Sequence, residues 1–437
     1  LSGCATYHAN PLPQSNDLTS TPAVTVPKHK LDIPAYQTQV FKPGHGMTMD
    51  QAVTVAVLNN PKLKARRKKA GVAMAQLVQA GLIPNPQLSA NLTHATSGPP
   101  PIFPLAYSTG LSESIRGLIL HASKKSAAKA RVRKVNLNIL WQEWQVAEKA
   151  RKLYIKLHAD KRLSQLLNKR VSLYQHQYTS DKQALQAGNL TRSRVSADLV
   201  GLVHAKTALR KLERHHNQTW HAFDALLGVK PGVHFKLSSS LSIKPLNQHR
   251  FHKAVSHLPH RRPDMLALRA GYQSQNAAVR QAILGQFPNL SVGVTKASDT
   301  SHVHSVGLSV SLALPLFNHN QGQIAIARAT RAHLKQAYQA RLDQAIGKAH
   351  ELRHAIQIMQ HQLAGLKKRL PELEQTTDAA QQSFKHGNMT AGTYINLRSS
   401  DLSTRLQTIH LRATLLQTRV ALETVLGMTL GPAAQQG

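Results

Sequence analysis

Two kinds of hydrophobic pattern alternate along this chain. Over long stretches, apolar residues recur at three- and four-residue spacing, which predicts amphipathic helices. We expect helices over 48–83 and 251–286, and much longer ones over about 118–184 and 322–384. At ~1.5 Å per residue, each of the longer helices is on the order of 100 Å long. Helices of that length favour a coiled-coil-like tube over a compact globule.

Short runs with period two follow the first and third of these helices. A proline-containing segment ends each helix, and alternating residues with Val and Leu on one face then indicate strands. The predicted strands cover about 87–95 and 106–114, then about 289–297 and 304–314. The second pair is joined by a turn predicted over Ala297–Ser301. Each pair of strands is therefore expected to form a hairpin.

The order of elements repeats because the chain contains two copies of one unit of about 200 residues. Pro61 aligns with Pro263 and, after one small gap, Gly188-Asn189 aligns with Gly387-Asn388. The predicted divisions are a residual lipoprotein signal over 1–4, an extended arm over 5–46, a first repeat over 47–228, a linker over 229–250, a second repeat over 251–430 and a tail over 431–437.

Four strands per chain cannot close a barrel, and an open sheet leaves two edges exposed. Three chains would supply twelve strands, and strands of this length can cross a bilayer when tilted. No run of 18 uncharged apolar residues predicts a membrane-spanning helix. The pattern therefore predicts an α+β membrane protein that forms a symmetric oligomer, with a β-barrel at one end and a helical tube at the other.

Composition changes this picture in two respects. The chain carries 55 Lys and Arg against 20 Asp and Glu, a formal net charge of +35. The basic residues are spread over the whole length and aromatic residues make up only 5%, so we expect no nucleic-acid partner. The single cysteine, Cys4, excludes an internal disulfide, and its Leu-Ser-Gly-Cys context indicates a lipidation site at the end of a signal peptide.

Several motifs resemble those of the TolC family of outer-membrane efflux proteins. They are the opening 47–52, the segments 59–63 and 79–86, and the run after the last strand, 314–322, whose Asn-Gln-Gly is most similar to the heavy-metal-efflux branch. The resemblance implies a homotrimer with a twelve-stranded β-barrel and an α-helical tunnel. It also implies an outer-membrane, lipid-contacting location and docking onto a periplasmic adaptor and an inner-membrane pump, or a type I secretion-like assembly. We expect no enzymatic activity and no cofactor.

The same resemblance assigns roles to the helix tips. The segments that would dock the adaptor are Gly188, Asn189, Leu190, Thr191 and Gly387, Asn388, Met389, Thr390. The family often carries an acidic residue shortly after each tip turn. Here the corresponding positions hold Arg194, Thr393 and Asn396, which are our candidates for the aperture. The missing carboxylates count against cation selectivity and against the metal branch, and favour hydrogen-bonded or arginine-based gating contacts.

Two alternatives of other classes stay open at this point. His350-Glu351-Leu352-Arg353-His354 matches the zinc-protease pattern, in which two histidines bind zinc and the glutamate acts as base. The repeat aligns His350 with Arg151 and Glu351 with Lys152, which indicates ordinary polar helix positions. A basic coiled-coil scaffold that binds polyanions is the other alternative.

Overall fold

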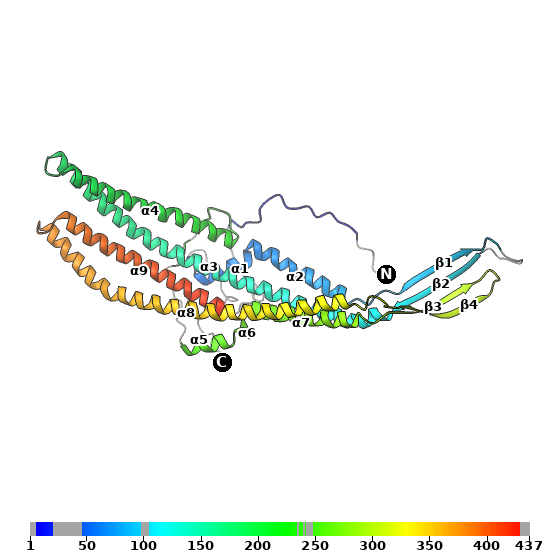
Figure 1. Cartoon of the computed structure of the whole chain (residues 1–437). Coiled ribbons are helices and arrows are strands. Elements are labelled where there is room, and N and C mark those ends of the chain that lie inside the picture. Colours follow the sequence, from blue (N-terminus) through cyan, green and yellow to red (C-terminus); the bar gives the residue numbers. More distant parts are fainter. Residues whose placement is uncertain are drawn as a thin grey trace.

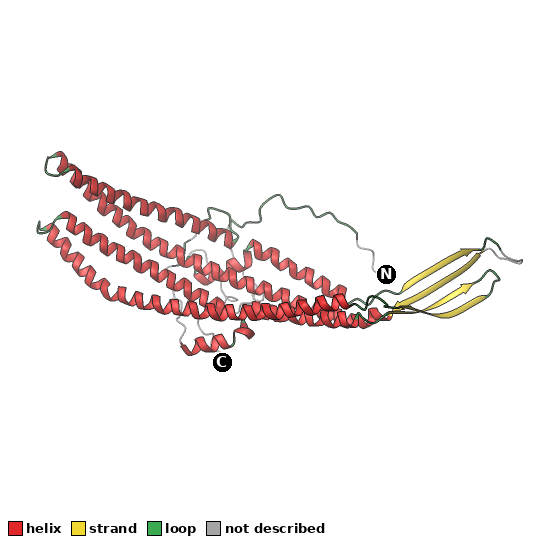
Figure 2. Ribbon diagram, viewed as in Figure 1, coloured by secondary structure: helices red, strands yellow, loops and turns green. Residues whose placement is uncertain are grey.

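The molecule is long and narrow, with a β-sheet at one end and the tips of two helical hairpins at the other (Figures 1 and 2). The computed structural model describes residues 6–20, 46–97, 105–233, 236–238, 241 and 248–428. Cys4 and the predicted tail 431–437 lie outside the described residues. Within the described residues, no helix combines the length and the apolar character needed to cross a membrane.

Both repeats run through the same succession of helices, hairpin and long helices. In the first repeat the elements are α1 (Met49–Asn59), α2 (Pro61–Ala80), β1 (Gln87–His94), β2 (Leu105–Ser114), α3 (Ile115–Gln186) and α4 (Arg192–Leu227). In the second they are α5 (Gln248–Ser256), α6 (Leu258–Arg261), α7 (Pro263–Leu284), β3 (Asn289–Ser298), β4 (His304–Ala313), α8 (Gln321–Lys385) and α9 (Ala391–Leu426).

The two shorter predicted helices are each divided, which corrects the expectation of single helices over 48–83 and 251–286. The division in the first repeat falls at Asn60, because the following Pro61 disfavours helical backbone at the residue before it. The Asn60 side chain instead accepts a hydrogen bond from the backbone N–H of Leu63 (3.1 Å) and donates one to the carbonyl of Leu226 (3.0 Å). In the second repeat a corresponding break precedes Pro263, where Arg262 has extended backbone angles.

Two element boundaries also differ from the prediction. α5 begins at Gln248, inside the segment 229–250 that was predicted to be a linker. β3 continues to Ser298, so the turn starts later than the predicted Ala297–Ser301. The Asp299 side chain shapes this turn, because its Oδ1 accepts hydrogen bonds from the backbone N–H groups of Ser301 (2.8 Å) and Val303 (3.0 Å).

Toward the tips, the long helices lie side by side in the order α4, α3, α9, α8 (Figure 1). The middle pair joins the two repeats, and the Tyr174 hydroxyl of α3 donates to the Ser399 hydroxyl of α9 (3.1 Å). Toward the sheet, α7 packs along α3, where the Ser274 hydroxyl donates to the carbonyl of Ala127 (2.9 Å). In the order α4, α3, α9, α8, the outer helices of the row are α4 and α8.

The main hydrophobic cores lie near the middle of the molecule, where short helices pack on long ones. One contains Tyr154 and Phe223, and the other contains Phe251 and Met265. Beside the first core, Arg151 of α3 forms an ion pair with Glu423 of α9, and the side chains are 10% and 1% exposed. Arg151, which aligns with the exposed His350 of the second repeat, is therefore a buried link between the repeats.

Candidate functional site: the sheet faces and the helix tips

The four strands form one antiparallel sheet in chain order, so the hairpins of the two repeats pair through β2 and β3. Leu111 lies opposite Val294 and Ser112 lies opposite Gly293. The strands approach closely here, since a Cβ at Gly293 would lie 2.5 Å from the carbonyl oxygen of Leu111. β1 and β4 are the two edges of the sheet, so one chain leaves the sheet open.

The register sorts the side chains of the strands onto two chemically different faces, because successive residues point to opposite sides. One face, here named the apolar face, carries Leu88, Ala90, Leu92, His94, Leu105, Tyr107, Thr109, Leu111, Glu113, Leu290, Val292, Val294, Lys296, Ser298, His304, Val306, Leu308, Val310 and Leu312. The other, the hydroxyl face, consists of Ser, Thr, Asn, Gln, Gly and Ala. No charged side chain lies on the hydroxyl face within the described strands.

The apolar face also carries a few polar residues, among them Thr109, which lies opposite Lys296. Glu113 lies at the end that joins the helices, while Lys296 and the two histidines lie toward the hairpin turns. Between them the face presents Leu and Val, and these are strongly exposed in the single chain: Leu308 is 82% exposed and Leu88 is 79% exposed. A face made mainly of Leu and Val is the pattern of a barrel's outer surface in lipid, and a polar opposite face is the pattern of its interior.

At the other end of the molecule, both predicted tip segments adopt the same turn. Gly188 and Gly387 have φ angles of 79° and 77°, a left-handed conformation that suits glycine. Asn189 donates its backbone N–H to the carbonyl of Ala184 (2.8 Å), and Asn388 does so to Ser383 (2.9 Å). These bonds satisfy the last carbonyls of α3 and α8.

The next helix of each tip then begins at a threonine. The Thr191 hydroxyl accepts from the backbone N–H of Arg194, and the Thr390 hydroxyl accepts from that of Thr393 (3.3 Å). Leu190 and Met389 are half-buried, while both tip asparagines and both threonines are exposed. Two equivalent polar loops therefore project from the end of the row of helices.

Of the three aperture candidates, Arg194 alone is placed between the two repeats. Its guanidinium lies 3.4 Å from Asp181 and 3.6 Å from Asp198. It also lies against Gly392 of α9, where a Cβ would come within 2.6 Å of Nη2. Thr393 and Asn396 are exposed side chains on α9. The Thr393 hydroxyl is hydrogen bonded to that of Thr390 (2.9 Å).

The carboxylates that Arg194 joins form a coupled pair. Burial, together with the hydrogen bond and the charge of Asp181, raises the pKa of Asp198 to about 6, although Arg194 opposes the rise. Burial acts to raise the pKa of Asp181 as well, but its hydrogen bonds with Asp198, Gln177 and Arg194 lower it on balance. Near neutral pH this cluster therefore holds two carboxylates and one guanidinium, and it takes up a proton on Asp198 as the pH falls through about 6.

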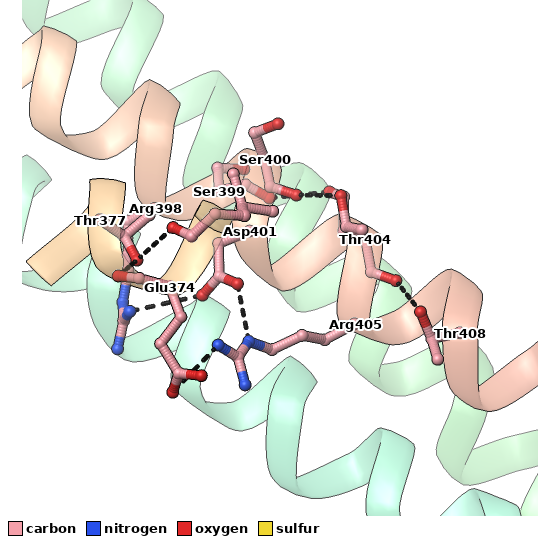
Figure 3. Close-up of polar contacts among 11 residues, drawn as sticks. Glu374, Thr377, Arg398, Ser399, Ser400, Asp401, Thr404, Arg405 and Thr408 are labelled. Atoms are coloured by element: carbon pink, nitrogen blue, oxygen red, sulfur yellow. Dashed lines mark hydrogen bonds and ion pairs between the residues drawn. The ribbon is translucent and has the colours of Figure 1, made fainter. Parts of the chain in front are cut away.

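A second charged network lies about three helical turns along α9 from its tip (Figure 3). Asp401 is buried and accepts from Arg405 (2.6 Å) and from Arg398 (3.3 Å). Arg405 also reaches Glu374 of α8 (3.3 Å), so the network ties the two helices of the second hairpin together. The hydrogen bond that Arg405 donates to Asp401 raises the pKa of Arg405, which keeps this arginine charged.

Sequence reasoning missed these carboxylates because it looked for acidic residues immediately after each turn. The signal was present in the spacing, since Asp198 follows Arg194 by four residues and Asp401 lies between Arg398 and Arg405 at helical intervals. Asp181 and Glu374 lie on the opposing helices of each hairpin. Asp181 and Glu374 reach the arginines only because the two helices of each hairpin align, and no pattern within one helix predicts that alignment.

The zinc-protease motif lies within α8, and two of its residues pack against the ring of Phe251. His350 packs edge-on against the ring of Phe251 (5.3 Å between centroids), and the Arg353 guanidinium lies over the same ring (4.4 Å). Glu351 is exposed and pairs with Lys348 (2.6 Å). Within the described part of the chain, no group of three His, Cys, Asp or Glu side chains is arranged to hold a metal ion.

Comparisons with known proteins agree with this geometry. Residues 254–428 match the model of the family described as outer membrane efflux protein. Among solved structures, CusC is 17% identical, with 95% of this chain and 100% of that chain covered and a TM-score of 0.70. The outer-membrane channel OprN is 14% identical (98% and 100% covered, TM-score 0.73). The CmeC outer membrane channel of Campylobacter jejuni is 15% identical (98% and 96% covered, TM-score 0.73).

A comparison with curated protein sequences gave no match. The fold is nevertheless that of the TolC-like outer-membrane channels over nearly the whole chain, and the second repeat carries the sequence pattern of the outer membrane efflux family. The resemblance stated from the sequence is thereby confirmed, as is the predicted TolC-like fold.

Proposed function

We propose that three copies of this chain close a twelve-stranded barrel in the outer membrane and a helical tunnel beneath it. The assembly conducts passively what an inner-membrane pump delivers through a periplasmic adaptor. The observation that carries the proposal is the sheet itself: an open sheet with one apolar face and one uncharged polar face. Such a sheet is complete only when its edges are paired and its apolar face is in lipid.

The backbone hydrogen-bonding groups of the two edge strands, β1 and β4, can pair with those of neighbouring copies. β4 of one copy lies next to β1 of its neighbour once three sheets are arranged around an axis, and all strands then have partners. The apolar face points outward to the membrane and the hydroxyl face lines the bore. Lys296 lies toward the hairpin turns, where its long side chain can extend to the headgroups.

The outer helices of the row support the same assembly. α4 exposes Leu199 (42%), Val200 (55%) and Val203 (53%) along one side. α8, at the other edge, exposes Ile358 (44%). Pairing α4 of one copy with α8 of the next covers these residues and continues the row of helices into a closed tunnel.

The bore is expected to favour anions. The hydroxyl face contributes no charge within the described strands. Selectivity therefore comes from the helical tunnel, in a chain with a formal net charge of +35. The tip loops around Gly188 and Gly387, with their exposed asparagines, are the surface offered to the adaptor.

The oligomeric state tests the proposal. The full chain, extracted from membranes in a non-ionic detergent, is measured by light scattering coupled to size-exclusion chromatography, with the detergent mass subtracted. We expect three times the 48.0 kDa of one chain. A folded monomer or dimer of the protein would contradict the proposal.

Docking at the tips is tested in the native host. A deletion strain first defines the compounds to which loss of the gene sensitises the cells. We expect Asn388→Asp to raise that sensitivity, because it places a charge on an exposed adaptor-facing loop, while Asn136→Asp, at an exposed position of α3 far from the tips, changes nothing. Both variants should still form trimers. Equal resistance in the two strains would remove the tip from the docking surface.

We also propose that Cys4 carries a lipid, as its sequence context indicates. Mass spectrometry of the N-terminal peptide from the protein isolated from its host should show acyl modification. An unmodified cysteine in the mature protein would contradict the proposal.

A further inference from the structure

A cleft of about 560 Å³ opens between α3 and α9, the two helices that join the repeats. It is here named the inter-repeat cleft. Its cationic and polar lining comes from facing stripes of the two helices: His158, Arg162 and Gln165 from α3, and Arg405, Thr408 and Arg412 from α9. The helical intervals of three and four residues place the members of each stripe on one side of their helix. The volume is in the range that holds a small organic molecule.

The charge of the inter-repeat cleft is not neutralised by its own lining. No carboxylate is among the described residues that line it. Arg405 is partly compensated, because it binds Asp401 and Glu374 outside the cleft. Within the described part of the chain, no carboxylate lies within ion-pair distance of Arg162 or Arg412. Two exposed guanidiniums therefore face one opening from opposite helices.

Beneath these cations the cleft is apolar. Ile155 and Leu416 are buried, and Leu166, Leu370 and Ile409 are partly buried. A recess lined by apolar side chains and by guanidinium groups from two helices matches a ligand with two parts, an apolar body and an anionic head. Guanidinium groups bind planar or tetrahedral oxyanions through parallel hydrogen bonds, and they keep their charge at every physiological pH.

The cleft is separate from the surfaces that a second copy would cover. It lies in the middle of the row of helices, whereas the proposed contacts between copies use the outer helices α4 and α8 and the edge strands. It is also distant in sequence from the tip loops. Its use by a ligand therefore does not depend on the trimer or on the conduit.

We propose that the inter-repeat cleft binds an amphiphilic anion, a molecule with a carboxylate, sulfonate or phosphate head on an apolar body. The arginines at the rim hold the head and the aliphatic floor receives the body. Because the ligand contacts α3 and α9 together, its binding also holds the two repeats in one relative position. An exported organic acid and an anionic lipid share this chemistry.

Binding is measured by isothermal titration calorimetry on the full chain in a non-ionic detergent, with naphthalene-2-sulfonate as the probe. We expect saturable binding with one site per chain. The charge-inverted analogue, a trimethylammonium naphthalene, and sulfate alone should bind far more weakly, because one lacks the anionic head and the other the apolar body. Equal binding of the cationic analogue would overturn the proposal.

Variants locate the site. Arg162→Gln with Arg412→Gln should weaken binding of the probe about 10-fold or more, as expected when charge-assisted hydrogen bonds are lost. Arg131→Gln with Arg328→Gln removes the same charge from two exposed helix positions and should leave binding unchanged. Arg162→Lys with Arg412→Lys should restore most of the affinity. If both glutamine pairs bind the probe as the wild type does, the cleft is not the site.

The source of the natural anion is then separated by native mass spectrometry of the protein as isolated. An anionic lipid retained by the wild type and lost in the double glutamine variant identifies a lipid. A protein that carries no lipid yet binds the probe identifies a soluble acid. Both results require the wild-type protein to bind the probe. A wild-type protein that binds no probe and retains no anionic lipid contradicts the proposal.

Discussion

The guanidinium of Arg194, in the first repeat, occupies the space that a side chain at Gly392, in the second repeat, would fill. This contact joins the two hairpins of one chain at their tips. The two tip turns have equivalent sequences, but they contribute differently to this contact. The first hairpin contributes the guanidinium of Arg194, and the second contributes Gly392, which has no side chain and leaves room for it.

We predict that Gly392→Val loosens this contact. The new side chain displaces the flexible end of Arg194, so the helices themselves keep their positions while the link between the hairpins is lost. If the link narrows the end of the tunnel, the unitary conductance in a planar bilayer should rise. Gly365→Val on α8 is the matched control, because a Cβ there meets no atom within 4 Å. Identical conductance in the two variants would contradict the role of Arg194.

The two faces of the sheet predict opposite effects for neighbouring substitutions on β4. Leu308→Asp puts a carboxylate on the apolar face, in the row of Leu111 and Val294, at a cost on the order of 1–2 kcal/mol per chain in lipid, so less trimer should insert into liposomes. Ser311→Asp puts it on the hydroxyl face, so the trimer should insert normally. Its three added carboxylates should shift the reversal potential toward cations. A reversed pattern would show that the faces are assigned the wrong way round.

Asp198 predicts a pH dependence of stability. Burial and Asp181 raise its pKa to about 6 in the folded chain, above its value in the unfolded chain. The folded state therefore binds this proton more tightly, and stability from this group increases as the pH falls from 7.5 to 5. The stability that protonated Asp198 contributes is lost again as the pH rises through about 6. We expect an effect on the order of 1 kcal/mol or less, since the group is partly exposed.

The measurement compares apparent Tm values at pH 5 and pH 7.5, at one heating rate. The Tm at pH 5 minus the Tm at pH 7.5 should be smaller in Asp198→Asn than in the wild type. Asp378→Asn, at an exposed position of α8, should retain the wild-type difference. The other titrating groups are common to all three proteins, so the comparison isolates Asp198. An unchanged difference in Asp198→Asn would contradict the coupling.

The buried pair of Arg151 and Glu423 predicts strong non-additivity. Removing one partner leaves the other charge buried, so Arg151→Met or Glu423→Met alone should lower the free energy of unfolding by about 3–5 kcal/mol. Replacing both should cost less than either single change. A double-mutant cycle from urea unfolding in detergent checks this. Additive losses would show that the two side chains do not interact.

Local patterns in the sequence were sufficient to locate the strands and the tip turns. The alternation around Val292 and Val294 follows directly from the pleat of a strand, and Gly188 with Thr191 supplies both a helix end and the start of the next helix. The division at Asn60 was equally local, because Pro61 restricts the residue before it. Two adjacent residues, Asn60 and Pro61, are therefore enough to predict this division.

Contacts between distant helices could not be obtained in the same way. Arg151 has the sequence context of a surface residue, and only the packing of α9 against α3 places Glu423 beside it. The inter-repeat cleft likewise depends on two stripes separated by more than 200 residues in the chain. Such sites arise from the alignment of long helices, which a periodic pattern along one helix does not specify.

Single-channel recording tests most directly whether the chain forms a conduit. The full-length protein, purified in detergent, is added to a planar bilayer under a salt gradient. We expect discrete, long-lived conductance steps with a reversal potential that leans toward anions. Well-folded protein that inserts and gives no conductance, or that fails to insert at all, would contradict the claim.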